Sequence, residues 1–239
     1  FELTPGEGLG IIGPTGAGKT TLARILVGAW PHYRGVVRLG GAELAQYPED
    51  QLGRSVGYLP QDVELYDGTI GENICRFQSD AKANDIIEAA KQADVHSLIL
   101  SFPDGYETMI GEGGAMLSAG QRQRIGLARA LYGNPALIVL DEPNANLDAA
   151  GEKAVITAVN SARDNGSTVI VIAHRPSAIA SLDTLMMLRD GRCVAIGPKD
   201  EVLDKVIQRT PAPAAPPRPA PGFQSMGMSL SSKPDEAAE

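Results

Sequence analysis

Ten residues near the start of the sequence combine three glycines with three threonines and one lysine. They read GPTGAGKTTL, from Gly13 to Leu22. Their spacing matches G-x-x-x-x-G-K-[ST], in which backbone N–H groups surround phosphate oxygens, the lysine reaches the terminal phosphates and the following hydroxyl binds Mg²⁺. Phosphate or nucleotide contacts are therefore expected from the whole loop: Gly13, Pro14, Thr15, Gly16, Ala17, Gly18, Lys19, Thr20 and Thr21. Thr20 is also the first candidate metal ligand.

A second segment supplies the acidic groups that a nucleotide site requires. The stretch ALIVLDE (136–142) is a continuous apolar run that ends in Asp141 and Glu142. Ligands of open α/β sheets bind beyond the carboxyl ends of the strands. We expect Asp141 to hold Mg²⁺ and Glu142 to polarise an attacking water. An ordinary acidic strand end would look the same in isolation, and the glycine loop is what favours the nucleotide interpretation.

The elements that must position these residues alternate along the chain. The pattern predicts strands and strand-turns at 8–13, 35–41, 55–60, 136–142, 167–174 and 184–197, and helices at 19–29, 79–102, 117–133, 148–164 and 198–207. Strands that alternate with helices indicate an α/β fold with a mostly parallel sheet. A helical region of about 75–133 interrupts the alternation.

Composition limits the classes of function. The 239 residues carry a net charge of -8 and only 5% aromatic residues, which disfavours a surface made for nucleic acid. Cys75 and Cys193 match no metal-binding spacing, and both are expected to be buried thiols. Residues 210–239 contain seven of the 17 prolines and no apolar period, so a solvated tail is expected after a domain at 1–207.

Four further motifs narrow the family. LSAGQRQR (117–124) resembles the signature motif of ATP-binding cassette (ABC) proteins, and GYLPQD (57–62) resembles their Q-loop. NLDAAGE (146–152) and VIAHRP (171–176) resemble their D-loop and switch loop. The order and approximate spacing are those of the family. The resemblance covers about residues 1–207 and implies a P-loop ABC ATPase whose helical region is the signature subdomain.

The resemblance also implies roles for individual residues. Gln61 is expected to sense Mg²⁺ or the attacking water, and His174 to contact the γ-phosphate. The signature and D-loop are expected to contact nucleotide in a head-to-tail pair of cassettes, each signature closing on the phosphate held by the other chain. The residues concerned are Ser118, Gly120, Gln121 and Asp148. ATP and Mg²⁺ are the implied cofactors.

Two departures from the family pattern bear on binding. Ala119 stands where the signature usually has glycine, which restricts the backbone there and is expected to have a modest effect. The family's adenine-stacking aromatic residue would lie upstream of Phe1, as would a membrane-spanning region.

DGTIGENI (67–74) and ETMIGEGG (107–114) resemble exporter segments that touch the membrane domain, with Glu112 as a candidate contact. The chain as a whole looks most like cassettes of bacterial type I protein secretion. That resemblance implies a second cassette, a transmembrane domain in the same or a companion chain, a membrane fusion protein and an outer-membrane channel as partners. It places the chain on the cytoplasmic face of the inner membrane. The alternatives are an exporter of lipids or small molecules, a cassette acting on nucleic acid or ribosomes, and a regulatory cassette that does not hydrolyse ATP.

Overall fold

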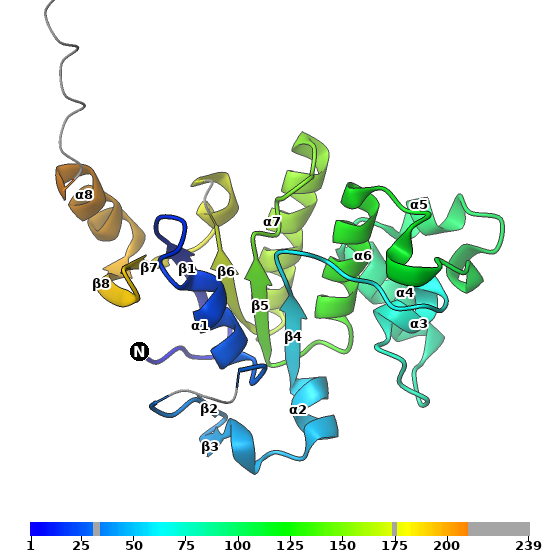
Figure 1. The fold of residues 1–239 in the computed structure, drawn as a ribbon, viewed down its shortest axis with the longest axis horizontal. Helices are drawn as coiled ribbons and strands as arrows, with labels where there is room; N and C mark the ends of the chain where they lie inside the picture. The colour runs from blue at the N-terminus through cyan, green and yellow to red at the C-terminus, as the bar shows by residue number, and fades with distance from the viewer. Residues whose placement is uncertain (31–33, 174–175, 210–239) are drawn as a thin grey trace, which may run out of the picture.

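A six-stranded sheet forms the centre of the structure (Figure 1). The computed structural model describes residues 1–30, 34–173 and 176–209. In sheet order the strands are β4 (Val56–Leu59), β5 (Leu137–Asp141), β6 (Thr168–Ile172), β1 (Gly8–Ile12), β7 (Thr184–Arg189) and β8 (Arg192–Pro198). Within this sheet the first five strands are parallel, and β8 alone pairs antiparallel, with β7. The predicted α/β fold with a mostly parallel sheet is confirmed.

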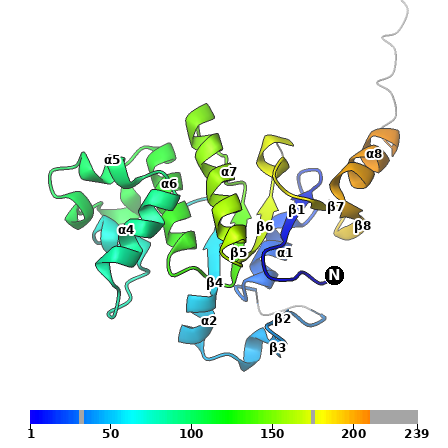
Figure 2. The same cartoon turned by 180° about the vertical axis from the view of Figure 1, so that it is seen from behind.

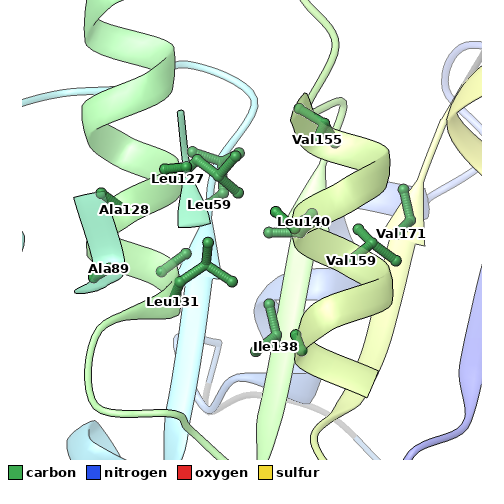
Figure 3. Packing of buried hydrophobic residues seen from close by; sticks show 14 of the residues in the cluster. Leu59, Ala89, Leu127, Ala128, Leu131, Ile138, Leu140, Val155, Val159 and Val171 are labelled. Atoms are coloured by element: carbon green, nitrogen blue, oxygen red, sulfur yellow. The ribbon is translucent and has the colours of Figure 1, made fainter. Parts of the chain in front are cut away.

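Helices cover both faces of this sheet. Helix α1 (Lys19–Leu26) lies in front of it in Figure 1, and α7 (Ala149–Asp164) is in front in the reverse view of Figure 2. Side chains of a strand alternate between faces, so β5 divides its apolar residues between two cores. Leu137 and Val139 join the cluster of α1, whereas Ile138 and Leu140 pack with α6 (Ala119–Leu131) and α7 (Figure 3). Burial of this kind contributes about 1.5–3 kcal/mol per large apolar side chain.

The helical region lies beyond β4, at one end of the sheet (Figure 1). It contains α3 (Ile70–Ile74), α4 (Ala83–Gln92), α5 (His96–Leu100) and α6. It begins earlier than the expected boundary near residue 75, and the predicted helix at 79–102 is two helices. The break is a Schellman turn: Asp94 adopts a φ of 52° and the Val95 N–H donates to the Ala90 carbonyl at 2.9 Å.

Arg76 connects the helical region to the sheet. It follows α3 with a φ of 59°, and its guanidinium donates to the carbonyls of Arg129 and Val56 at 3.0 Å each and to that of Gly53. The Arg129 carbonyl belongs to the last turn of α6, where carbonyls lack partners within the helix. Burial, and secondarily the charge of Arg129, lowers the pKa of Arg76 to about 10. The single side chain therefore joins α3, α6 and the segment in which α2 (Glu49–Ser55) leads into β4.

The remaining elements surround this framework. The strand-turn expected at 35–41 is only a short antiparallel ribbon of β2 and β3, and the helix α2 was not predicted. The remaining elements are β2 (Arg38–Leu39), β3 (Ala42–Glu43), α2 (Glu49–Ser55), α8 (Lys199–Arg209) and the 3₁₀ turns η1 (Leu44–Gln46), η2 (Gly105–Glu107), η3 (Glu112–Gly114) and η4 (Pro176–Ile179).

The described residues also include the predicted hairpin and both cysteines. The hairpin at 184–197 is confirmed, and Asp190 and Gly191 both have positive φ at its turn. Cys75 is buried as expected, but the expectation for Cys193 is wrong because its strand β8 is a sheet edge and leaves it exposed. Residues 210–239 lie outside the described residues. Across the described ranges, every helix is too short or too polar to traverse a bilayer.

Candidate nucleotide-binding site

The glycine loop connects the end of β1 at Ile12 to the start of α1 at Lys19. Gly13, Gly16 and Gly18 have φ values of 152°, 79° and 92°, which side chains of L-residues rarely adopt. Gly18 is the N-cap of α1 and provides no side-chain cap. The first-turn N–H groups of α1 therefore face a loop without a competing acceptor side chain, as an anion-binding helix start requires.

Gly13 is fixed by a close approach as well as by its backbone angle. A methyl group built on it would lie 2.2 Å from the Leu188 carbonyl oxygen of β7, whereas one on Gly16 meets nothing within 4 Å. We expect Gly13→Ala to lower the free energy of unfolding by about 2–5 kcal/mol, from backbone strain and overpacking together. Gly16→Ala is the control, with strain alone of about 1–2 kcal/mol. Urea denaturation without nucleotide measures both, and equal losses would contradict the role assigned to the Leu188 contact.

Lys19 closes over the loop. Its side chain is buried, and Nζ donates to the carbonyls of Gly13 and Pro14 at 3.0 Å each. Burial lowers the pKa of Lys19, while the negative charges of Glu142 and Asp141 act in the opposite direction. The ammonium group is thus held between the loop and the acidic end of β5.

Asp141 is the last residue of β5 and is completely buried. Neither carboxylate oxygen makes a hydrogen bond of ordinary geometry with any described residue, although the Thr20 hydroxyl is close enough to lower its pKa. Burial is the larger influence and raises the pKa of Asp141; the charge of Glu142 adds to that rise, and those of Lys19 and Arg24 oppose it. A buried carboxylate without a partner is costly. Together with the Thr20 hydroxyl, it is a donor set that fits Mg²⁺.

Glu142 leaves the strand in an unusual backbone conformation. Its φ is 52°, and its N–H donates to the Ile172 carbonyl of β6 at 2.9 Å. Gln123 of α6 braces the turn by donating to the Pro143 carbonyl at 3.2 Å. Positive φ at a residue other than glycine is strained and concentrates at functional sites. Here it turns the Glu142 side chain away from the strand direction and toward the glycine loop.

One cavity brings these segments together. It has a volume of about 470 Å³ and is lined by Thr15, Gly16, Gly18, Lys19, Thr20, Thr21, Gln61 and Glu142. The glycine loop, the Q-loop glutamine and the acidic strand end therefore converge on one cavity. The predicted contacts Gly13, Pro14, Ala17 and Asp141 are not among the residues that line it. His174 falls outside the described residues.

The signature residues stand apart from this cavity. Ser118 is exposed and caps α6: its Oγ accepts from the Gln121 N–H at 3.2 Å, and the Gln121 side chain accepts from the Ser118 N–H at 2.8 Å. Ala119 begins α6 and is absent from the described residues with positive φ, so its methyl group fits an ordinary helical backbone. Within the described chain, none of 118–121 lines the cavity.

Asp148 also lies outside the cavity lining and acts as a helix cap in this structure. It accepts from the Gly151 N–H at 2.8 Å and from Arg124 Nη2 of α6 at 3.2 Å. A methyl group on Gly120 would lie 3.0 Å from the Asn146 carbonyl oxygen. The start of the signature helix therefore packs directly on the D-loop.

Sequence reasoning left two neighbours of Asp141 unnamed. They are Arg24 and Tyr58: burial and then the charge of Asp141 raise the pKa of Tyr58, and the hydrogen bond and charge of Arg24 oppose that rise. Arg24 could have been identified from the sequence, because it lies four residues after Thr20 and therefore on the same face of α1. Tyr58 lies within the motif GYLPQD, in which only Gln61 was predicted to be a site residue.

The sheet order, the glycine loop at the end of β1 and the acidic end of β5 together define a P-loop nucleotide-binding α/β domain. The family model described as "ABC transporter" matches residues 1–145, and the chain belongs to this family. It is an ABC transporter ATPase domain, and such domains bind ATP. The predicted family is thereby confirmed.

Three relatives place the chain within the family. It is 58% identical over 208 residues to the type I secretion system ATP-binding protein PrsD of Rhizobium meliloti, with 87% of this chain and 36% of that protein covered. It is 40% identical over 205 residues to an ATP-dependent lipid A-core flippase of Chromobacterium violaceum, covering 86% and 35%. The solved structure of a bacterial Atm1-family ABC exporter with ATP bound superposes with a TM-score of 0.78 at 34% identity, covering 90% and 39%. The chain thus spans little more than a third of the length of these proteins.

Proposed function

We propose that residues 1–207 form the ATP-hydrolysing motor of an exporter. Two copies would close on ATP, and hydrolysis would let them separate and move an attached membrane domain. The observation that carries this proposal is that the cavity holds the loop, Gln61 and Glu142 but no signature residue among those described. The pocket of one chain is therefore incomplete at the side where the signature of a second chain would close it.

The residues of the cavity divide the chemistry between them. The α1 N–H groups and Lys19 would bind the phosphates, and Thr20 and Asp141 would hold Mg²⁺, with Gln61 at its edge. When bound, Mg²⁺ would neutralise charge on the phosphate oxygens. Glu142 would accept a proton from water as the water oxygen bonds to the γ-phosphorus and the bond to the ADP oxygen breaks. His174 would contact the γ-phosphate.

The signature supplies donors to the opposite chain. The Ser118 Oγ accepts from Gln121 with a lone pair, which leaves its O–H as a donor. The Gln121 N–H is already engaged in that bond. The N–H groups before it, including that of Gly120, are the ones we expect to meet the terminal phosphate. Asp148 would contribute by holding the D-loop beside them.

Type I protein secretion is the export process that we propose for the whole protein. The 58% identity to a type I secretion ATP-binding protein supports it. Under this proposal the chain works on the cytoplasmic face of the bacterial inner membrane. Its partners are a second cassette, a transmembrane domain, a membrane fusion protein and an outer-membrane channel.

Mixing two inactive variants tests the shared pocket. Lys19→Ala removes the phosphate side, and Ser118→Arg blocks the signature side. We expect each alone to hydrolyse ATP poorly and a 1:1 mixture to regain up to about a quarter of the wild-type rate, because half of the dimers contain one intact pocket of two. Phosphate release from the mixture is the measurement.

The control mixes Lys19→Ala with Asp141→Asn. Both changes damage the same half of the pocket, so no dimer of this mixture contains an intact site and no recovery is expected. A Lys19→Ala and Ser118→Arg mixture that shows only the mean of the separate rates would mean that each chain completes its own pocket.

A further inference from the structure

Tyr58 places a polar group in the apolar core beside the site. Its ring is half-buried and packs against the apolar cluster of α1, while its hydroxyl oxygen is fully buried. The side chain therefore directs its polar end inward. The hydroxyl makes no hydrogen bond of ordinary geometry with any described residue. A buried hydroxyl is costly unless it is hydrogen-bonded, and Arg24 is a described residue that interacts with this one.

The strand register places that hydroxyl on the same face as Asp141. Tyr58 of β4 is paired with Val139 of β5, and both belong to the α1 side of the sheet. Asp141 is two residues beyond Val139, so its side chain projects from the same face. The Asp141 carboxylate is itself buried and lacks an ordinary hydrogen bond to any described residue. Two buried polar groups, neither with a hydrogen bond of ordinary geometry to a described residue, thus face the same layer between the sheet and α1.

Electrostatic effects also link the two groups. The pKa of Tyr58 is raised, first by burial and then by the negative charge of Asp141. Arg24 of α1 acts on both groups: its charge lowers the pKa of Asp141, and its hydrogen bond and charge lower the pKa of Tyr58. A guanidinium only donates, so the Tyr58 oxygen accepts from Arg24 and its O–H is left to donate elsewhere. Arg24 lies one helical turn after Thr20, the other proposed metal ligand.

We propose that Tyr58 is a positioning residue for Asp141, its hydroxyl donating through one bridging water to the carboxylate and orienting it toward the Thr20 hydroxyl. Arg24 completes the arrangement as the neighbouring positive charge. Groups that bond to a metal ligand fix its orientation, and their removal typically costs 10–100-fold in metal affinity. The inference rests on the proposed Mg²⁺ site at Thr20 and Asp141.

The experiment compares nucleotide affinity with and without the metal. A non-hydrolysable ATP analogue is titrated into the chain in excess Mg²⁺ and in EDTA, so hydrolysis has no part in the readout. We expect Tyr58→Phe to weaken binding about 10-fold in Mg²⁺ and to leave binding in EDTA unchanged. Arg24→Gln, on the exposed side of α1, is expected to act in the same direction and provides the test without altering the core.

Two controls separate the possible results. Tyr106→Phe removes a hydroxyl that is hydrogen-bonded to His96 Nδ1 at 2.8 Å in the helical region, and it should match the wild type in both buffers. Asp141→Asn should abolish most of the gain from Mg²⁺; if it does not, the metal site itself is wrong. If Asp141→Asn loses the gain while Tyr58→Phe and Arg24→Gln keep it, only the role of Tyr58 is overturned. Weaker binding of Tyr58→Phe in EDTA as well would show a general packing effect and would also overturn it.

Discussion

Replacing Glu142 with glutamine is expected to slow ATP hydrolysis by about 10²–10⁴-fold, the usual contribution of a general base. The change removes the carboxylate but keeps the size of the side chain. The strained backbone at φ 52° and the hydrogen bond to Ile172 do not depend on the side-chain charge. Binding of ATP should therefore persist, and the variant should accumulate as an ATP-bound dimer. Phosphate release and size-exclusion chromatography with ATP are the measurements.

The matched control is Glu49→Gln on α2, an exposed residue outside the cavity lining, which should hydrolyse ATP at the wild-type rate. A Glu142→Gln variant with normal turnover would show that another group accepts the proton. A variant that loses turnover and ATP binding together would indicate that Glu142 shapes the pocket rather than taking part in the reaction.

Replacing Lys19 with alanine is expected to act on binding itself. A charge-assisted hydrogen bond contributes about 1.5–3 kcal/mol, so the loss of even two to the phosphates weakens affinity by about 10²-fold or more. The same ammonium holds the Gly13 and Pro14 carbonyls, so the loop also loses its internal contacts. Titration with a fluorescent ATP analogue measures the effect.

Lys153→Ala on the exposed surface of α7 removes an equal charge and should leave the affinity unchanged. If Lys19→Ala binds the ATP analogue with unaltered affinity, the loop binds the phosphates through its backbone alone. A lower rate of hydrolysis with unchanged ATP affinity would mean that Lys19 acts in the chemical step and not in binding.

The sequence predicted the parts of the site that depend on residue type. Only glycine accepts the backbone of Gly13 beside Leu188, and a buried strand that ends in two carboxylates has few other uses next to such a loop. The convergence of Gln61 and Glu142 on one cavity followed from strand order. These features are local, or follow from a parallel sheet.

Features that depend on backbone geometry or on distant partners were not predictable in this way. Asp94 ends α4 although the apolar period continues through it, because a Schellman turn depends on backbone geometry rather than on that pattern. The hydrogen bond of Arg124 to Asp148 and the electrostatic effect of Asp141 on Tyr58 link residues far apart in sequence. A single sequence does not indicate which distant residues contact each other.

The bonds of Arg76 have a consequence for engineering. Because its guanidinium reaches the carbonyls at 53, 56 and 129, the helical region cannot be exchanged with that of another cassette as an independent module. A chimera joined after β4 must bring an arginine at this position together with an α6 that ends at the same height. Grafts that respect this match should keep the bonds between the helical region and the sheet, and mismatched grafts should lose them.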